Sequence, residues 1–309
     1  MTRLPKSVTR LVVVLALSSA GLWAAISSVR PSIPASANTC SIEQVALRTA
    51  DGVLLNGLLY RPLATPRSSA ILLVHGFGGN FYEAYFPVFA QEAAAQGYAT
   101  LALNMRDHDA GPKVSAFTDN ETDIGTGLAY LRKMGHSRFV LLGQSMGTNR
   151  VLYFEAVSND STIAATVLVS GPGNLFEWNV MQFGREKAQA SVDEARALET
   201  AGREREIMVV DLGPLGKALY TPRYLLSLRG PEARSDPFQN IQNVKTPILI
   251  LQGAADKLIA PDIATRLKKA AASNSKVVVV YVNGASHSFA GQETVLEERV
   301  LAWLKEVAP

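Results

Sequence analysis

The chain has 309 residues, of which 48% are hydrophobic and 18% are charged. This composition is typical of a globular protein, and the length allows one large hydrophobic core or two smaller ones. The sequence contains no repeat and no low-complexity tract, which excludes repeat architectures.

The first 37 residues are organised like a secretory signal peptide. Three basic residues and no acid precede an apolar run over residues 11–26, and Ala-Ser-Ala at residues 35–37 offers a cleavage site. The alternative is an uncleaved membrane anchor, although 16 residues with two serines are short for a bilayer span. We therefore predict that residues 1–37 are removed, without stable membrane insertion afterwards, and that residues 38–309 are periplasmic or secreted.

Removal of this segment changes the charge of the protein. The whole chain has 30 basic and 27 acidic residues, and residues 1–37 hold four of the basic ones and no acid. Residues 38–309 therefore hold 26 basic and 27 acidic residues, a net charge of −1, so we expect no basic surface for nucleic acid. The one cysteine, Cys40, excludes an intramolecular disulfide, which fits an exported bacterial protein with a core large enough to need no covalent link.

Apolar strands and amphipathic helices are predicted to alternate along the chain. Two strands flank an Asp51-Gly52 turn, as in a β-hairpin. Six further strands are predicted within residues 68–79, 98–107, 138–143, 163–171, 245–253 and 275–282, and helices within 86–97, 119–135, after Ser145, 261–272 and 294–307. Continuous apolar strands between helices indicate an α/β fold with a parallel sheet covered on both faces.

Residues from about 173 to 240 interrupt this alternation. They are polar and helix-prone at first and contain several prolines later, so we interpret them as an insertion between two strands. Ligands of such folds bind beyond the carboxyl ends of the strands, where residues 76–79, 144–147, 253–257 and 283–289 are expected to lie.

Ser145 stands in Gly143-Gln144-Ser145-Met146-Gly147, which matches the pattern G-x-S-x-G between a predicted strand and a predicted helix. In that context the glycines let the two backbones approach, and the turn raises the serine hydroxyl above the end of the sheet. The alternative is a plain tight turn. Serine is a weak nucleophile without an adjacent base, so chemistry at Ser145 requires a partner elsewhere in the chain.

His287 is the best candidate for that base, because it follows the last predicted strand and lies beyond a candidate acid in the chain. The acid is Asp256, four residues after a strand end, although it could also be an ordinary loop residue. The order Ser145, Asp256, His287 is the order expected for a serine at a strand-to-helix turn. The other histidines are expected to point into the fold or to lie at the surface: His75, His108 and His136.

Acyl transfer also needs donors for the oxyanion. Met146 offers a backbone N–H at the start of a helix, and the glycine-rich loop after residue 75 offers another, which we assign to Phe77. A phosphate-binding loop is the alternative, but the sequence here has neither the P-loop pattern nor the dinucleotide-binding spacing.

These segments resemble the landmarks of the α/β-hydrolase superfamily: LLVHGFGG, LLGQSMG, LILQGAADKLI and NGASHSF. The likeness covers about residues 41–306 and is greatest to bacterial carboxylesterases and serine-aminopeptidase-like members. It implies the α/β-hydrolase fold, a mostly parallel eight-stranded sheet flanked by helices, with residues 173–240 as an inserted helical cap. The chain departs from the common pattern at residues 106–109, which read Arg-Asp-His-Asp in place of Arg-Gly-His-Gly, and at Gln144, often a histidine.

Aromatic residues surround the predicted site and are candidates for substrate binding: Phe81 and Tyr82 after the oxyanion loop, and Phe176, Trp178 and Phe183 at the start of the cap. They favour an apolar or aromatic substrate, although ordinary packing explains them equally well. Asp107, His108 and Asp109 are adjacent and could not all face one ion, so we expect no metal and no cofactor.

The sequence therefore predicts a serine hydrolase that cleaves carboxylic esters of small molecules through an acyl-enzyme on Ser145. A peptidase or an acyltransferase with the same residues is an alternative, as is a non-catalytic binding protein that kept the fold. A dehalogenase is excluded, because it would need a carboxylate in place of Ser145.

Overall fold

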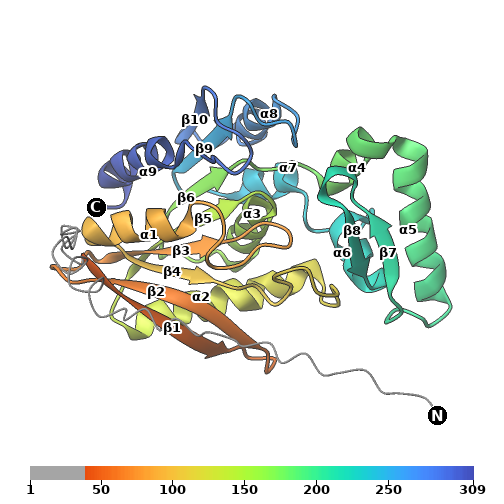
Figure 1. The fold of residues 1–309 in the computed structure, drawn as a ribbon, viewed down its shortest axis with the longest axis horizontal. Helices are drawn as coiled ribbons and strands as arrows, with labels where there is room; N and C mark the ends of the chain where they lie inside the picture. The colour runs from red at the N-terminus through yellow and green to blue at the C-terminus, as the bar shows by residue number, and fades with distance from the viewer. Residues whose placement is uncertain (1–38) are drawn as a thin grey trace, which may run out of the picture. The chain divides into compact units, whose positions relative to one another are not determined.

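An eight-stranded sheet runs through residues 39–309, the part of the chain that the computed structural model describes (Figure 1). The predicted signal peptide, residues 1–37, lies outside the described residues, so its cleavage stays a prediction. Among the described helices, none combines the length and the apolar character needed to cross a membrane.

The sheet is mostly parallel, as predicted. Its order is β1-β2-β4-β3-β5-β6-β9-β10, in which β1–β2 and β2–β4 are antiparallel and the remaining pairs are parallel. The strands are β1 (Cys40–Arg48), β2 (Leu54–Pro62), β3 (Ser69–Val74), β4 (Ala99–Leu103), β5 (Arg138–Gln144), β6 (Ile163–Val169), β9 (Ile248–Gly253) and β10 (Val277–Val282). The hairpin predicted around Asp51-Gly52 joins β1 to β2.

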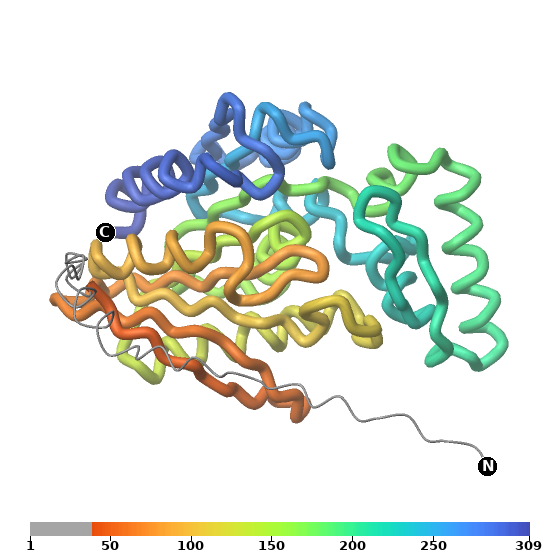
Figure 2. The backbone as a smooth tube through the Cα atoms, in the orientation of Figure 1, coloured from red at the N-terminus to blue at the C-terminus, as the bar shows by residue number. Residues whose placement is uncertain are grey.

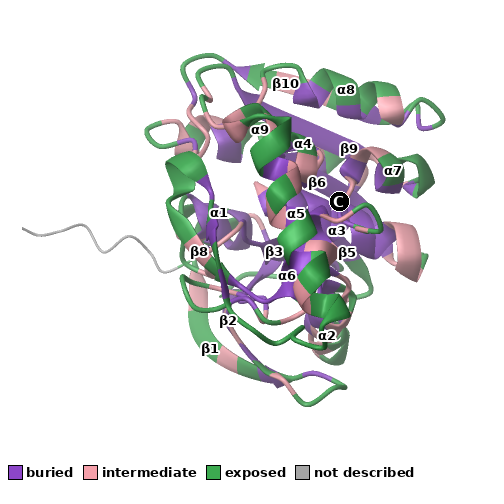
Figure 3. Cartoon of the chain, turned by 90° about the vertical axis from the view of Figure 1, so that its right-hand side faces the viewer, coloured by how far each residue is buried: buried purple, intermediate pink, exposed green. Residues whose placement is uncertain are grey.

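Helices cover both faces of the sheet. Along β3, Ala70, Leu72 and Val74 belong to one apolar cluster and Ile71 and Leu73 to the other, because successive strand residues point to opposite faces. The first cluster includes residues of α2 (Asn120–Lys133), α3 (Met146–Ser158) and α8 (Ile263–Ala270); the second includes residues of α1 (Phe86–Ala95) and α9 (Glu293–Val307). Burial on both faces explains the uninterrupted apolar strands, which are purple in Figure 3.

The cap, residues 173–240, leaves the sheet after β6 and returns before β9 (Figure 2). It was expected to be helical, but it also contains an antiparallel pair of strands, β7 and β8. These strands have four residues each, too short for a period of two to be recognised in the sequence. The elements between β6 and β9 are α4 (Leu175–Phe183), α5 (Arg185–Thr200), β7 (Met208–Asp211), β8 (Lys217–Tyr220), α6 (Pro222–Arg229), α7 (Pro237–Asn240) and the 3-10 turns Gly213–Leu215 and Ile241–Asn243; another such turn, Phe117–Asp119, precedes α2.

A third apolar cluster holds the cap together and joins it to the sheet domain. It combines cap residues such as Leu175, Val192 and Leu228 with Met146 and Tyr153 of α3. The cap is therefore packed on the helix that begins directly after Ser145.

Glu155 on α3 is a buried acid between β6 and the segment that leads into β9. Its carboxyl oxygens accept hydrogen bonds from the hydroxyls of Thr166 and Thr246. Burial raises the pKa of Glu155 from its usual value of 4.5 to about 7, although both hydrogen bonds act in the opposite direction.

We expect this carboxyl to make stability fall as the pH rises from about 4.5 to about 7. The folded chain binds the proton more tightly than the unfolded chain, so the contribution is complete below pH 4.5 and is lost as Glu155 ionises. The free energy of unfolding should fall by at most about 1.4 kcal/mol per pH unit from this group. The free energy of unfolding of Glu155→Gln, measured in urea, should therefore rise relative to that of the wild type from pH 5 to pH 8. A difference between the two proteins that does not change with pH would contradict this account.

Candidate active site

Ser145 occupies a strained turn between β5 and α3. Its backbone has φ 52° and ψ −125°, a conformation that residues with a side chain rarely adopt. The flanking glycines are needed for close approach: a Cβ on Gly147 would lie 2.1 Å from the carbonyl oxygen of Val74, and one on Gly143 would lie 2.4 Å from that of Gly147. The G-x-S-x-G pattern thus has a steric cause at this turn.

The structure brings Ser145, Asp256 and His287 together from three separate loops. His287 Nε2 lies 3.0 Å from Ser145 Oγ, and His287 Nδ1 lies 2.8 Å from Asp256 Oδ2. With the Nδ1 proton donated to the carboxylate, Nε2 is left to accept the hydroxyl proton of Ser145. This is the arrangement required of a nucleophile, a general base and an orienting acid.

The loops after β9 and β10 support this contact. The N–H of Ala255 donates to the carbonyl of Ala285 at 2.9 Å, which ties the acid loop to the histidine loop. Asp256 is buried, and its Oδ1 accepts from the N–H of Leu258 at 2.8 Å. The carboxylate is therefore held in place before it meets His287.

The N–H groups of Phe77 and Met146 are free to bind an oxyanion. Met146 is the first residue of α3, where amides have no acceptor within the helix. Within residues 39–309, neither N–H donates to a protein group. A Cβ added to Gly76 would lie 2.9 Å from Ser145 Cβ, so the loop that carries Phe77 packs directly against the serine.

His75 fixes the peptide that carries the Phe77 N–H. Its Nδ1 donates to the carbonyl of Gly76 at 2.7 Å, and its Nε2 accepts from the N–H of Met105 at 3.0 Å. Burial lowers the pKa of His75 to about 3, so the ring is neutral and can play both roles. Because the Gly76 carbonyl and the Phe77 N–H point in opposite directions across one planar peptide, the bond turns this N–H away from His75.

A cavity of about 30 Å³ lies beside Ser145. Its lining is apolar apart from Ser145 and one charged residue: Phe77, Met146, Pro172, Leu175, Trp178, Leu215, Arg229, Leu258 and Ile259. A volume of this size holds about one water molecule. Ser145 itself is partly exposed, so a larger substrate can extend from this cavity toward solvent.

Trp178 is the one predicted substrate-binding residue that lines this cavity. Its Nε1 donates to the carbonyl of Leu258 at 2.9 Å, two residues beyond Asp256. Phe176 and Phe183 lie on the opposite side of α4, because offsets of two and five residues turn them away from Trp178. Phe176 instead lines a separate cavity of the cap, and the Lys187 ammonium lies 4.8 Å from the ring centre of Phe183.

The two aromatic residues after the oxyanion loop also lie outside the cavity lining. Phe81 is half-buried and packs against the apolar cluster that includes α1, and Tyr82 is 61% exposed. The sequence showed a cluster of aromatic residues but not which of them would face Ser145.

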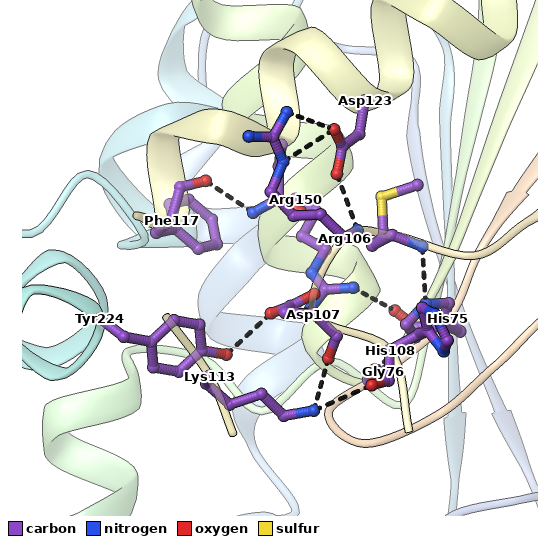
Figure 4. Close-up of polar contacts among 12 residues, drawn as sticks. His75, Gly76, Arg106, Asp107, His108, Lys113, Phe117, Asp123, Arg150 and Tyr224 are labelled. Carbon is purple, nitrogen blue, oxygen red and sulfur yellow. Dashed lines mark hydrogen bonds and ion pairs between the residues drawn. The ribbon is translucent and has the colours of Figure 1, made fainter. Parts of the chain in front are cut away.

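A buried polar network joins the cap to the helix of the nucleophile (Figure 4). Arg150 on α3 donates to both carboxylate oxygens of Asp107 at 2.8 Å, and the hydroxyl of Tyr224 on α6 donates to the same carboxylate at 2.8 Å. Arg150 also donates to the carbonyl of His75 at 3.4 Å. One ion pair therefore connects the cap, α3 and the oxyanion loop.

Lys113 closes the loop in which Asp107 stands. Its buried ammonium donates to the carbonyls of Asp107 at 2.6 Å and His108 at 3.1 Å, and also to that of Asp109. Asp107 faces Arg150, whereas His108 and Asp109 are paired with each other at 2.6 Å near the surface. Within residues 39–309, no three potential ligands are grouped to hold a metal.

Sequence reasoning missed this network. The signal available was Asp107 at a position where the common pattern has glycine. Its partners Arg150 and Tyr224 lie 43 and 117 residues further along the chain, so nothing local to Asp107 indicated them.

A model of the alpha/beta hydrolase family matches residues 71–298. The chain belongs to the alpha/beta hydrolase family. The match spans β3 to α9 and includes Ser145, Asp256 and His287. Comparison of the sequence with curated proteins gave no match.

Solved structures, one of them of an esterase domain, share this α/β-hydrolase fold. The esterase domain of a Rhodothermus marinus protein is 18% identical, with a TM-score of 0.61 over 87% of this chain and 100% of its own. Est1E from Butyrivibrio proteoclasticus is 18% identical, with a TM-score of 0.65 over 85% and 98%. The siderophore hydrolase EstB from Aspergillus fumigatus is 15% identical, with a TM-score of 0.66 over 87% and 98%. At these identities the likeness shows the fold.

Proposed function

We propose that this α/β-hydrolase cleaves carboxylic esters of small molecules through an acyl-enzyme on Ser145. The observation that carries the proposal is the continuous contact from Ser145 Oγ through His287 to Asp256, with separations of 3.0 and 2.8 Å. A protein that only binds ligands has no need of this contact, so the geometry favours catalysis.

The mechanism follows from the positions of these groups. His287 Nε2 takes the proton of Ser145 as Oγ attacks the ester carbonyl, and Asp256 stabilises the imidazolium that forms. The N–H groups of Phe77 and Met146 stabilise the oxyanion. His287 then returns its proton to the leaving alcohol, and a water molecule, activated by the same histidine, releases the acid from Ser145.

The relatives agree with this proposal. Structures with the same fold are described as an esterase domain from Rhodothermus marinus and an esterase from Pyrococcus furiosus, and Est1E is described with ferulic acid bound. A small aromatic acid fits the expectation of a small-molecule substrate. The predicted signal peptide supports a periplasmic or secreted location for this activity.

Matched esters and amides test the reaction class. We expect hydrolysis of 4-nitrophenyl acetate and butyrate, and much slower cleavage of the corresponding 4-nitroanilides. Faster turnover of the anilides would favour the peptidase alternative. Transfer of the acyl group to added alcohols or amines in preference to water would favour an acyltransferase, and no turnover of any of these compounds would contradict the proposal.

Substitution of Trp178 tests whether the cap selects substrates by the size of the acyl group. Trp178→Ala removes the side chain from the cavity and should change kcat/KM for bulky acyl groups by about tenfold or more. It should change the turnover of a small acetate ester by much less. Steady-state kinetics across a series of acyl lengths measures both effects.

Trp178→Phe separates the shape of this side chain from its hydrogen bond. The phenyl ring fills much of the same space but cannot donate to the carbonyl of Leu258, near Asp256. If Trp178→Phe lowers turnover of small and bulky esters equally in folded protein, the cap positions the acid loop and does not select substrates.

A further inference from the structure

Arg229, the last residue of α6, is the one charged residue in the lining of the cavity beside Ser145. It is 5% exposed, and the rest of the lining is apolar apart from Ser145 itself. The mechanism proposed above does not use it. A buried cation in an apolar cavity is costly unless a negative charge or strong acceptors satisfy it.

The protein satisfies Arg229 incompletely. Its Nε donates to Asn179 Oδ1 at 3.2 Å, and its Nη1 donates weakly to the Tyr220 hydroxyl at 3.4 Å. Within residues 39–309, Nη2 has no hydrogen-bond acceptor in the protein and keeps some contact with solvent, and no carboxylate lies within 4.0 Å of the guanidinium. An arginine carries five N–H donors, so most of them remain available.

Two other arginines with little exposure, Arg150 and Arg106, differ from Arg229 in having carboxylate partners. Arg150 pairs with Asp107 through two hydrogen bonds of 2.8 Å. Arg106 pairs with Asp123 and Asp51 at 2.7 Å each. Arg229 thus differs from both in having no carboxylate partner among the described residues.

Neighbouring acids and the end of the helix do not compensate this charge directly. Arg229 also borders a second cavity of about 360 Å³, lined in part by Glu177 and Asp236. Asp236 accepts from Asn174 and from the N–H of Phe238, and Glu177 pairs with Arg185. The negative end of α6 favours a cation, but no carbonyl of this helix accepts a bond from the guanidinium within the described residues.

Arg229 is linked to the oxyanion loop through the ring of Tyr220. Its guanidinium carbon lies 5.6 Å from the ring centre of Tyr220, and Tyr220 packs edge-on against Phe77, with ring centres 6.0 Å apart. Phe77 carries one of the two free N–H groups beside Ser145. Arg229 therefore sits on the cap side of the site, one aromatic ring away from the oxyanion loop.

We propose that Arg229 binds a carboxylate of the substrate, so that the preferred substrates are esters that carry a free carboxylate close to the ester bond. This inference rests on the proposed esterase function and specifies its substrate class. A carboxylate supplies the planar pair of acceptors that a guanidinium matches. The apolar lining then contacts the short chain or ring between the carboxylate and the ester.

Two pairs of esters test the proposal and distinguish the side on which the carboxylate lies. Monoethyl succinate carries it in the acyl part, and ethyl 4-methylpentanoate is its neutral isostere. 4-Acetoxybenzoate carries it in the alcohol part, and its methyl ester is the neutral counterpart. We expect the wild type to prefer the carboxylate in at least one pair by about tenfold or more in kcat/KM.

Arg229→Gln should abolish that preference and leave the neutral esters within about threefold of the wild type, whereas Arg229→Lys should retain part of it. Arg185→Gln is the matched control, because Arg185 lies in the same cap with its side chain 67% exposed. Equal losses on charged and neutral esters in Arg229→Gln would show that Arg229 only holds the cap together. Preference of the wild type for the neutral ester in both pairs would also overturn the proposal.

Binding of the acid products separates this proposal from the proposed function. Calorimetric titration with succinate and with 4-hydroxybenzoate requires no turnover. We expect at least one of them to bind the wild type and to bind Arg229→Gln at least tenfold more weakly. If no ester is hydrolysed but a product binds in this way, the esterase function fails and the carboxylate site stands. If esters are hydrolysed and neither acid binds through Arg229, the carboxylate site fails alone.

Discussion

Ser145→Ala is expected to lower kcat for 4-nitrophenyl acetate by about 10⁴-fold or more. The hydroxyl that contacts His287 Nε2 at 3.0 Å is the one nucleophile at the mouth of the cavity, so its removal leaves the oxyanion donors without a covalent pathway. The strained turn at Ser145 is set by its glycines, and alanine fits it as well as serine does. Folding should therefore be unchanged, which circular dichroism and thermal unfolding would verify.

His287→Ala should give a loss of similar size, and the double variant should be no slower than either single one. Residues that act as one unit show this lack of additivity. Ser191→Ala, a substitution on α5 outside the lining of the cavity beside Ser145, serves as the matched control for loss of a hydroxyl. If Ser145→Ala kept more than a tenth of the wild-type rate, the assignment of the nucleophile would be wrong.

Arg150→Met is expected to lower the free energy of unfolding by about 3–5 kcal/mol. Burial alone would raise the pKa of the Asp107 carboxyl, and Arg150 beside it holds that pKa below its usual value. Methionine preserves much of the volume but leaves Asp107 buried without its counter-charge. The hydroxyl of Tyr224 remains as a donor and cannot replace an ion pair.

The double variant Asp107→Asn/Arg150→Met should recover a substantial part of this loss. Asparagine carries no charge and can still accept from Tyr224. Urea unfolding of the wild type, both single variants and the double variant completes a double-mutant cycle. Additive losses would show that the ion pair contributes little, and a stable Arg150→Met variant would contradict the role assigned to this contact.

The fold could be predicted because its signals are local. Each buried strand from β3 onward in the main sheet is a short, largely apolar run, such as Ser69–Val74, and a helix follows each of them. Alternation of this kind restricts the sheet to a parallel arrangement and places the loops after the strands at one edge. That edge is where Ser145, Asp256 and His287 meet, so the candidate site could be inferred from chain order and residue type.

The rest of the site depends on contacts between distant segments. The cap begins at a recognisable break in the alternation, but its path is set by tertiary packing, including the pairing of Lys113 with Leu219 and Thr221. The sequence gives no sign that Asp107 meets Arg150, or that Arg229 enters the cavity. The aromatic residues of α4 could not be sorted from the sequence either. Phe176 and Phe183 lie on one side of the helix, and Trp178, on the other side, is the one that lines the cavity.

Labelling with a fluorophosphonate probe tests the central claim most directly, because the probe reacts with a serine that an adjacent base activates and forms a stable adduct. Intact mass measurement of folded wild-type protein should show one adduct per chain, and peptide mapping should place it on Ser145. Ser145→Ala should not react, and His287→Ala should react far more slowly. An unlabelled wild-type protein, or an adduct on a residue other than Ser145, would contradict the account.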